Sequence, residues 1–169
     1  MEGMLLLVDP DKCTGCRTCE VACSMRHFWE CNPTRSMIKV IRYEKQGEYF
    51  VSIPVVCQQC ETPMCKGVCP VNAIHQDPKT GAYVVNQDVC MGCRLCVIAC
   101  PVSGISIDPE ANIAVKCDLC GGDPLCARFC ANGAITYVRR DKIGRAKARE
   151  GALKISELLT LTATAARGA

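Results

Sequence analysis

Large aromatic residues and long apolar runs are both scarce in this chain. It contains three Phe and one Trp in 169 residues, so a folded core needs a further source of cohesion, such as disulfides or bound metal. No stretch approaches the roughly eighteen apolar residues of a membrane-spanning helix, which argues against a transmembrane segment. The apolar run at residues 4–8 is short and follows no basic segment, so it predicts a strand and not a secretory signal.

Cysteine, by contrast, is abundant, with 17 residues. The lack of a secretory signal predicts a cytoplasmic protein, and disulfides are rare in that compartment. The odd number of cysteines also argues against a complete disulfide framework. We therefore interpret these side chains as thiolate ligands for metal.

The cysteines fall into four runs of four, and only Cys31, in HFWECNP, lies outside them. We interpret Cys31 as an ordinary free thiol. Runs one and three share the spacing C-x2-C-x2-C-x3-C, whereas runs two and four widen the middle gap to x4 and x5. The runs in chain order are Cys13, Cys16, Cys19 and Cys23; Cys57, Cys60, Cys65 and Cys69; Cys90, Cys93, Cys96 and Cys100; and Cys117, Cys120, Cys126 and Cys130.

Two kinds of metal site compete for such runs. Structural zinc sites usually pair one C-x2-C with a second pair about a dozen or more residues away. Three cysteines at the closer spacing fold around one face of an iron–sulfur cubane, and a distant cysteine supplies the fourth ligand. In two-cluster ferredoxins, the last cysteine of each run binds the other run's cluster. Four complete runs therefore predict four [4Fe–4S] clusters with no ligand missing.

The last cysteine of runs two, three and four opens a repeated motif. The three segments are CPVNAI, CPVSGI and CANGAI, and each ends in an Ile five positions after the cysteine. We predict that Ile74, Ile105 and Ile135 pack beside the clusters, because an apolar shell excludes water and helps to set the reduction potential. Run one departs from this motif, since its last cysteine opens CSMRHFWECN.

At these runs the chain resembles the iron–sulfur subunits of the dimethyl sulfoxide reductase type, which carry four [4Fe–4S] clusters on two ferredoxin-like modules. The resemblance spans about residues 4–138. Small cytosolic members of the family accompany tungsten enzymes of the aldehyde ferredoxin oxidoreductase type, and others accompany formate dehydrogenases and hydrogenases. The resemblance implies that run one pairs with run four and run two with run three, whereas spacing alone leaves the pairing one–two and three–four open.

The pairing implied by the resemblance defines four ligand sets, which we number I to IV. Set I is Cys13, Cys16, Cys19 and Cys130; set II is Cys23, Cys117, Cys120 and Cys126; set III is Cys57, Cys60, Cys65 and Cys100; set IV is Cys69, Cys90, Cys93 and Cys96. Each set takes three cysteines from one run and the fourth from its paired run.

The same resemblance predicts an α+β fold of two bacterial-ferredoxin-like modules, one inserted in the other, with short β-hairpins and a C-terminal helix. The outer dicluster module would comprise residues 1–23 and 109–138, and the inner one residues 57–108. The connection, residues 24–56, contains MIKVIRYEKQGEYFVSIPVV, which predicts two strands around a KQGE turn. AIHQDPKTGAYVV predicts a second hairpin, and RTCEVAC and RLCVIAC each predict one or two helical turns.

Residues 139–169 are predicted to form a basic amphipathic tail helix. RRDKIGRAKAREGALK carries seven basic and two acidic residues, and Ala148, Ala152, Ile155 and Leu159 recur at helical spacing. Such a helix would lie back on the cluster-bearing body, or dock on a partner subunit or a second copy of this chain; a helix on a membrane surface is a less favoured alternative. No aromatic residues interleave with the basic ones, so we expect no nucleic-acid partner.

Function follows from the predicted clusters. A cluster with four cysteine ligands leaves no open position for a substrate, so we expect an electron-transfer subunit that is not catalytic alone. It would pass low-potential electrons between the catalytic subunit of an anaerobic oxidoreductase and another redox partner, such as a flavin or iron–sulfur subunit. By resemblance, the catalytic subunit is a tungsten or molybdenum pterin enzyme of the aldehyde oxidoreductase type.

Other interpretations stay open. The chain could serve a formate dehydrogenase or hydrogenase, diffuse freely as a soluble polyferredoxin, or act as a metalloenzyme maturation factor. Association of copies through their cluster-bearing ends is a further alternative.

We interpret His27 and His75 as packing or surface residues, and place Trp29 near the first cluster or at an interface. No Ser-His-Asp set, phosphate loop or dinucleotide motif is visible.

Overall fold

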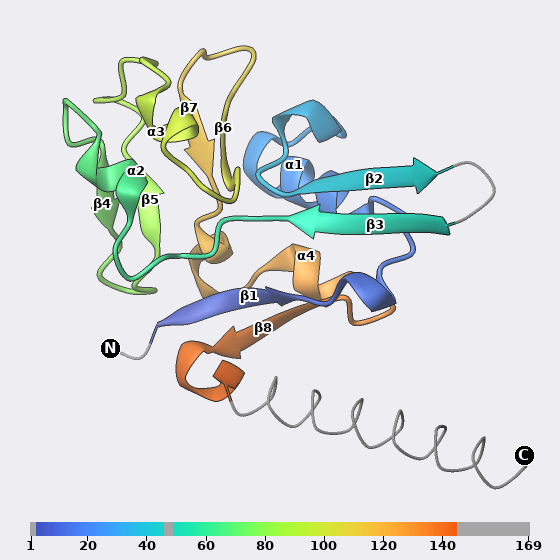
Figure 1. Cartoon of the computed structure of the whole chain (residues 1–169). Helices are drawn as coiled ribbons and strands as arrows, with labels where there is room; N and C mark the ends of the chain where they lie inside the picture. Colours follow the sequence, from blue (N-terminus) through green and yellow to red (C-terminus); the bar gives the residue numbers. More distant parts are fainter. Residues whose placement is uncertain (1–2, 46–48, 145–169) are drawn as a thin grey trace, which may run out of the picture.

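Short antiparallel strand pairs and short helices make up the computed structural model, which describes residues 3–45 and 49–144 (Figure 1). This is the predicted α+β class, with four separate two-stranded sheets among the described residues. The strand pairs are β1 (Met4–Val8) with β8 (Ile135–Arg139), β2 (Lys39–Lys45) with β3 (Tyr49–Val55), β4 (Ile74–Gln76) with β5 (Tyr83–Val85), and β6 (Ile105–Ile107) with β7 (Ala114–Lys116).

The β1–β8 pair joins the two ends of the described chain. Leu6 lies opposite Tyr137 in the register and is completely buried, and the Asp9 N–H extends the ladder with a hydrogen bond to the Ala134 carbonyl (2.8 Å). The strand predicted at Met4–Val8 is confirmed, whereas the sequence analysis did not identify β8. This pairing brings the first cysteine run beside the last one (Figure 1).

The four short helices share one relation to the cysteine runs. Each begins one residue before the third cysteine of a run. The helices are α1 (Thr18–Phe28), α2 (Met64–Gly67), α3 (Leu95–Ile98) and α4 (Leu125–Arg128). Three single-turn 3-10 helices accompany them: η1 (Pro10–Lys12), η2 (Pro33–Arg35) and η3 (Leu119–Gly122).

Helix α1 is longer than the one or two turns predicted for this segment. It has 11 residues, about three turns, and packs against α4 and η2. The buried Glu20 on α1 accepts a hydrogen bond from the Val40 N–H at 2.6 Å. Ser24, also buried, accepts one from the Asn32 N–H at 3.2 Å. These tertiary contacts stabilise the extra turns of α1. The local sequence of the helix does not predict them, because the partner residues lie outside it.

The β2–β3 hairpin confirms the prediction of two strands in the connecting segment. Val40 and Ser52 point inward and are buried, whereas their neighbours Ile41 and Ile53, directly opposite each other, are 55% and 40% exposed. Adjacent residues of a strand face opposite sides, so the hairpin presents an apolar outer face. The hairpin predicted in AIHQDPKTGAYVV is also present, as β4–β5.

The core is built around thiols instead of aromatic rings. One cluster of buried residues combines Leu6, Ile38 and Leu119 with cysteines from three of the runs, and a second combines Ile74 and Ile105 with Cys96. The scarcity of Phe and Trp therefore reflects a core in which cysteine side chains occupy the central positions.

The two-module division remains a prediction. The tail helix expected over residues 139–169 lies outside the described residues from position 145 onward. Within the part of the chain that the structure describes, no helix has the length and apolar character needed to cross a membrane.

Candidate metal centres

Three cavities are each lined by four cysteines. The first contains the side chains of set I, Cys13, Cys16, Cys19 and Cys130. The second contains those of set III, Cys57, Cys60, Cys65 and Cys100. The third contains those of set IV, Cys69, Cys90, Cys93 and Cys96. In every case three cysteines come from one run and the fourth from a distant run.

Set II gathers in the interior between α1 and the last cysteine run. The pKa of Cys126 is raised to about 12. Burial is the largest cause, and the charges of Cys120, Cys23 and Cys19 add to it. Burial likewise raises the pKa of Cys120 to about 11, with Asp118 and Cys23 among the neighbours that add to it. The pKa of Cys117 is raised well above its ordinary value by burial, with further contributions from Cys126 and Cys23. Cys23, Cys117, Cys120 and Cys126 are thus close neighbours.

The same electrostatic neighbours order the sets in a row. Cys126 of set II is influenced by Cys19 of set I, and Cys117 of set II by Cys57 of set III. Cys96 of set IV is influenced by Cys65 of set III. These relations place set II beside sets I and III, and set III beside set IV, and we describe the sets as a row in the order I–II–III–IV.

A turn of one type positions the first two cysteines of every run. The residue before the second cysteine has a positive φ in all four runs: Gly15 (70°), Gln59 (48°), Gly92 (70°) and Leu119 (60°). This backbone region favours glycine, and a Cβ on Gly92 would lie 2.3 Å from the Asn112 carbonyl oxygen. In sets I, III and IV the turn lets both cysteines face the same cavity.

A second turn follows the last cysteine of runs two and three and directs a backbone N–H at its sulfur. Asn72 and Ser103, three residues after the cysteine, have φ of 51° and 50°. Hydrogen bonds to sulfur are one means by which a protein sets a cluster's potential. The N–H donors are Ala73 to Cys69 and Gly104 to Cys100, each at 3.3 Å; elsewhere Met37 donates to Cys23 (3.3 Å), Gln59 to Cys57 (3.5 Å) and Ala114 to Cys90 (3.4 Å).

The packing predicted for the three isoleucines is confirmed. Ile135, Ile105 and Ile74 are buried, and each lines one of the three cysteine cavities.

The solvent exposure of a cysteine depends on its position within the run. The second cysteine of runs one to three, Cys16, Cys60 and Cys93, is exposed, while others are covered to different degrees.

The donor set fits iron–sulfur clusters. Burial raises the pKa of Cys19 to about 12, so a thiol in this position holds its proton at neutral pH unless a cation replaces it. Four sulfur donors around one cavity are typical of zinc or iron–sulfur sites. Each of the three cavities is also lined by an isoleucine, and those of sets III and IV have backbone N–H donors to sulfur, which suits a redox cluster. Twelve cysteines line these three cavities and the four of set II gather beside α1, whereas Cys31 is exposed and belongs to neither group.

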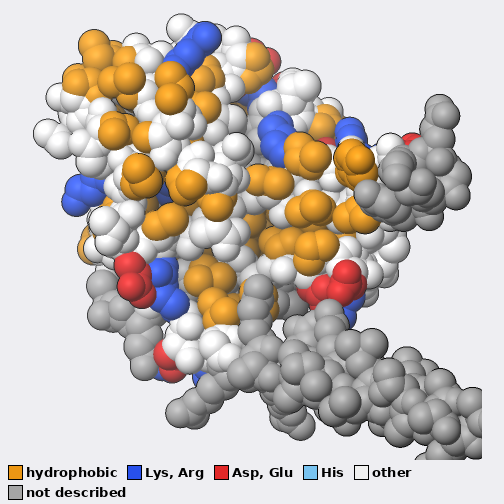
Figure 2. Space-filling model, in the orientation of Figure 1, with side chains coloured by type: hydrophobic (Ala, Val, Ile, Leu, Met, Phe, Trp, Pro, Cys, Tyr) orange, Lys and Arg blue, Asp and Glu red, His pale blue; other side chains and the backbone are white. Residues whose placement is uncertain are grey.

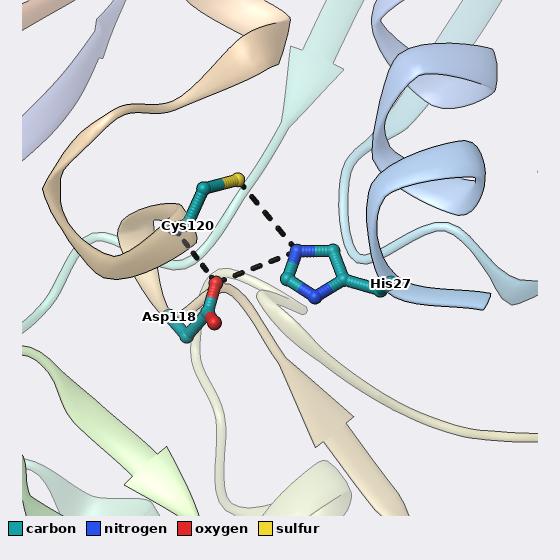
Figure 3. A group of neighbouring side chains, drawn as sticks. All are labelled: His27, Asp118 and Cys120. Atoms are coloured by element: carbon teal, nitrogen blue, oxygen red, sulfur yellow. Dashed lines mark hydrogen bonds and ion pairs between the residues drawn. The ribbon is translucent and has the colours of Figure 1, made fainter. Parts of the chain in front are cut away.

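One group that the sequence analysis missed lies beside set II. His27 Nε2, on α1, is 3.6 Å from Cys120 Sγ and 3.5 Å from Asp118 Oδ1, and the Cys120 N–H donates to the same carboxylate oxygen at 2.8 Å (Figure 3). Burial holds the pKa of His27 below its ordinary value, although Asp118 opposes this. A neutral imidazole with its proton on Nε2 would donate to the Asp118 carboxylate and the Cys120 sulfur, and we assign this tautomer to His27. His75 is exposed.

Gln59 and Lys116 form a second unforeseen group, at set III. The buried Gln59 donates from Nε2 to the Cys117 carbonyl (2.7 Å) and accepts from the Tyr83 N–H (2.8 Å). Burial raises the pKa of Cys65, and the charge of Lys116 opposes that rise. Both residues look like ordinary surface residues in the sequence, because only the fold buries them.

Comparison with known proteins identifies the family. A model of the 4Fe–4S dicluster domain matches residues 48–140, and one of a 4Fe–4S binding domain matches residues 4–25. The chain is 43% identical to the aliphatic sulfonate oxidoreductase, polyferredoxin-like subunit, of Pyrococcus furiosus over 76% of this chain and 72% of the relative. It is 34% identical to the putative electron transport protein YsaA of Escherichia coli over 86% and 96%.

A probable anaerobic dimethyl sulfoxide reductase subunit of Escherichia coli, YnfG, is 34% identical, over 77% of this chain and 70% of the relative. Among solved structures, one polypeptide of the active site complex BamBC of benzoyl coenzyme A reductase superposes with a TM-score of 0.48 and 26% identity, covering 93% of this chain and 96% of that one. That superposition alone does not establish a shared fold. The matches in sequence do establish kinship, and this protein belongs to the 4Fe–4S dicluster family of iron–sulfur proteins that includes the polyferredoxin-like and dimethyl sulfoxide reductase subunits.

Proposed function

We propose that this chain is the electron-transfer subunit of an anaerobic oxidoreductase complex and carries four [4Fe–4S] clusters, one on each of sets I to IV. It would pass low-potential electrons between a catalytic subunit and a second redox partner. A [4Fe–4S] cluster with four cysteine ligands exchanges single electrons and has no open position for a substrate. The chain would accordingly have no catalytic activity alone.

The observation that carries this proposal is the composition of the cysteine cavities. Cys130 joins the first run, Cys100 joins the second, and Cys69 joins the third. This exchange of the last cysteine between two runs is the arrangement of two-cluster ferredoxins. Zinc sites of four cysteines would not need the exchange, since each run already offers four thiols.

The row of sets supports a conducting role over a storage role. Sets I and IV occupy the two ends of the row, and their second cysteines, Cys16 and Cys93, are exposed, as is Cys60 of set III. Set II is covered in the interior, where Cys23, Cys117 and Cys126 are buried. A row that reaches the surface at both ends suits transfer between two different partners.

The protein's own residues would tune these sites in three ways. Backbone N–H groups donate to cysteine sulfur in sets II, III and IV. Such bonds favour the more negative sulfur of a reduced site, and therefore raise its potential. Ile74, Ile105 and Ile135 keep water from the cavities, and the exposed second cysteines leave one corner of sets I, III and IV open to a partner.

Exposed apolar side chains support a role within a complex. Figure 2 shows hydrophobic side chains in several patches on one face, with acidic and basic groups between them. Near runs two and three, Met64, Met91 and Ile98 are exposed by 58%, 64% and 80%, and near runs one and four Trp29 and Phe129 by 85% and 58%. Apolar surface of this kind is typical of protein–protein contacts.

We propose a tungsten or molybdenum pterin enzyme as the catalytic partner. Support comes from the resemblance to small members of this family and from the 43% identity to a polyferredoxin-like subunit named for an aliphatic sulfonate oxidoreductase. A second partner, with flavin or iron–sulfur clusters, would complete the electron path.

Anaerobic affinity purification of the chain from its native cell, with metal analysis, tests the proposal. We expect about sixteen iron atoms per chain and a co-purifying subunit with stoichiometric tungsten or molybdenum. Nickel in the complex would indicate a hydrogenase partner instead. A chain that arrives alone with full iron would contradict the subunit role, and zinc with little iron would contradict the cluster assignment.

A further inference from the structure

Lys116 is a buried cation on the wall of the set III cavity. It is the last residue of β7, directly before Cys117 of set II, and is 4% exposed. Its side chain lines the same cavity as Cys57, Cys60, Cys65 and Cys100. Lys116 therefore lies where the two central sets of the row meet.

No carboxylate neutralises this ammonium group among the described residues. Nζ donates to Gln59 Oε1 at 3.5 Å and to the Tyr83 carbonyl, and both acceptors are uncharged. In residues 3–45 and 49–144, no acidic side chain forms an ion pair with it. A buried ammonium without a counter-charge is strongly unfavourable.

The other buried charged residues in this part of the chain are satisfied. Glu20 accepts from the Val40 N–H, and Asp108 pairs with Arg35. Glu20 also has an opposite charge nearby, since its charge opposes the fall in the pKa of Lys39 that burial causes. Lys116 differs from both, because its hydrogen-bond acceptors in the described part of the chain are uncharged. The set III cysteines line the same cavity as Lys116, and the charge of Lys116 opposes the rise in the pKa of Cys65 that burial causes.

We propose that Lys116 is the counter-charge of set III and raises the reduction potential of the cluster held there above the value it would have without this cation. Reduction adds one negative charge to the site, and a fixed cation in a region of low dielectric favours the more negative state. This inference rests on the proposed function. With this cation, the set III cluster would have a higher reduction potential than it would otherwise have. An electron moving along the row would then be held at set III between transfers.

Lys66 offers a matched control. It follows Cys65 directly and lies 5.9 Å from the ring centroid of Tyr83, but its side chain is exposed. Replacing either lysine with Met removes one positive charge close to set III. Solvent and salt screen the charge of Lys66, whereas Lys116 is shielded from both.

The test is an anaerobic redox titration of the full-length holoprotein, followed by electron paramagnetic resonance, for wild type, Lys116→Met, Lys116→Gln and Lys66→Met. The set III signal is assigned by its change in Cys60→Ser. At the midpoint potential of the wild-type set III cluster, we expect the ratio of reduced to oxidised cluster to be about tenfold lower in both Lys116 variants. This corresponds to a midpoint potential lowered by about 59 mV for one electron. The other three clusters should change less, and Lys66→Met should change the ratio less than about threefold.

The glutamine variant separates charge from hydrogen bonding, because its amide still donates to the Tyr83 carbonyl but carries no charge. A wild-type potential in Lys116→Gln would overturn the proposal, as would unchanged potentials in both variants or an equal shift in Lys66→Met. Replacing a buried charge with an apolar side chain of similar volume is often neutral for stability, so Lys116→Met is expected to fold. A wild-type chain without cluster signals would instead overturn the proposed function, and the inference with it.

Discussion

Arg35 and Asp108 form a two-pronged ion pair between segments 73 residues apart in the sequence. Arg35 Nε donates to Asp108 Oδ1 at 2.9 Å and Nη2 to Oδ2 at 2.8 Å. The same guanidinium donates from Nη1 to Glu30 and Glu110 and lies 4.0 Å from the ring centroid of Phe28. The pair therefore fastens the segment after the first cysteine run to the turn of the β6–β7 hairpin.

Asp108→Asn should destabilise the holoprotein markedly. Asp108 is 2% exposed, and the substitution breaks the buried two-pronged pair, although Glu30 and Glu110 still face Arg35. We expect the midpoint of thermal unfolding to fall by on the order of 10 °C. Asp123→Asn is the control, because Asp123 and its partner Arg128 are both largely exposed; it should change the midpoint little. Equal effects of the two substitutions would contradict this assignment.

The same pair predicts a pH dependence. Burial opposes ionisation of Asp108, but the hydrogen bonds and charge of Arg35 outweigh it and hold the pKa of Asp108 below its ordinary value. The unfolded chain therefore binds the proton first as pH falls, and the stabilisation is present above about pH 4 and lost below it. The difference in unfolding midpoint between wild type and Asp108→Asn should shrink as pH falls through this range, and a difference that grows on acidification would refute the prediction.

The exchange of cysteines between runs predicts which substitutions are equivalent. Cys130→Ser and Cys13→Ser, at opposite ends of the described chain, should perturb the same cluster signal, since both residues line one cavity. Each should remove roughly four iron atoms per chain or convert that site to one of lower iron content. Cys31→Ser should leave the iron content unchanged, because Cys31 is exposed and belongs to none of the four sets. Loss of different signals in the first two variants would exclude a shared set I.

Gly104→Ala should disrupt set III through the backbone. A Cβ at this position would lie 2.6 Å from the Cys57 Cα and 2.8 Å from its nitrogen. The two backbone segments must move apart, which commonly costs about 1–3 kcal/mol and displaces the Gly104 N–H from Cys100 Sγ. Gly67→Ala is the control, since nothing lies within 4 Å of its added carbon. Iron content and thermal midpoint, measured for both variants, check the expectation; similar losses in both would contradict it.

His27→Leu should lower the potential of the set II cluster. The substitution removes the Nε2 donor that faces Cys120 Sγ, and a hydrogen bond to sulfur favours the reduced state. A bond worth about 1 kcal/mol corresponds to a shift on the order of 40 mV for one electron. Redox titration of the assigned signal provides the measurement, with the exposed His75→Leu as the control. An unchanged set II potential would show that the contact has no influence on the site.

The sequence predicted the parts of this fold that depend on local pattern. Strand β1 and the hairpins β2–β3 and β4–β5 follow from alternating apolar residues and turn residues. The burial of Ile74, Ile105 and Ile135 was predictable because each lies five positions after the last cysteine of its run. The four cysteines grouped at each of three cavities are those that the family resemblance implied, and their role as ligands stays a prediction until iron is measured.

Features that depend on distant segments were not predictable in this way. Strand β8 has its partner at the other end of the described chain, and Arg35 finds Asp108 only after folding. Lys116 in AVKCDLC resembles any exposed lysine, because burial of its ammonium depends on Gln59 and Tyr83. Helix α1 exceeds its predicted length for the same reason, since the contacts of Glu20 and Ser24 are with later segments.

The distribution of the four sets along the sequence imposes an order of assembly during translation. On the proposed ligand sets, sets III and IV would be complete once residue 100 has left the ribosome, because their cysteines all lie within residues 57–100. Set I needs Cys130, and the strand that joins the two ends, β8, is made later still. A nascent chain thus holds the first run of thiols, which ends at Cys23, without its partner until Cys130 is made. Set I would therefore be the last of the proposed sets to be completed, and the closing of β1 on β8 would follow it.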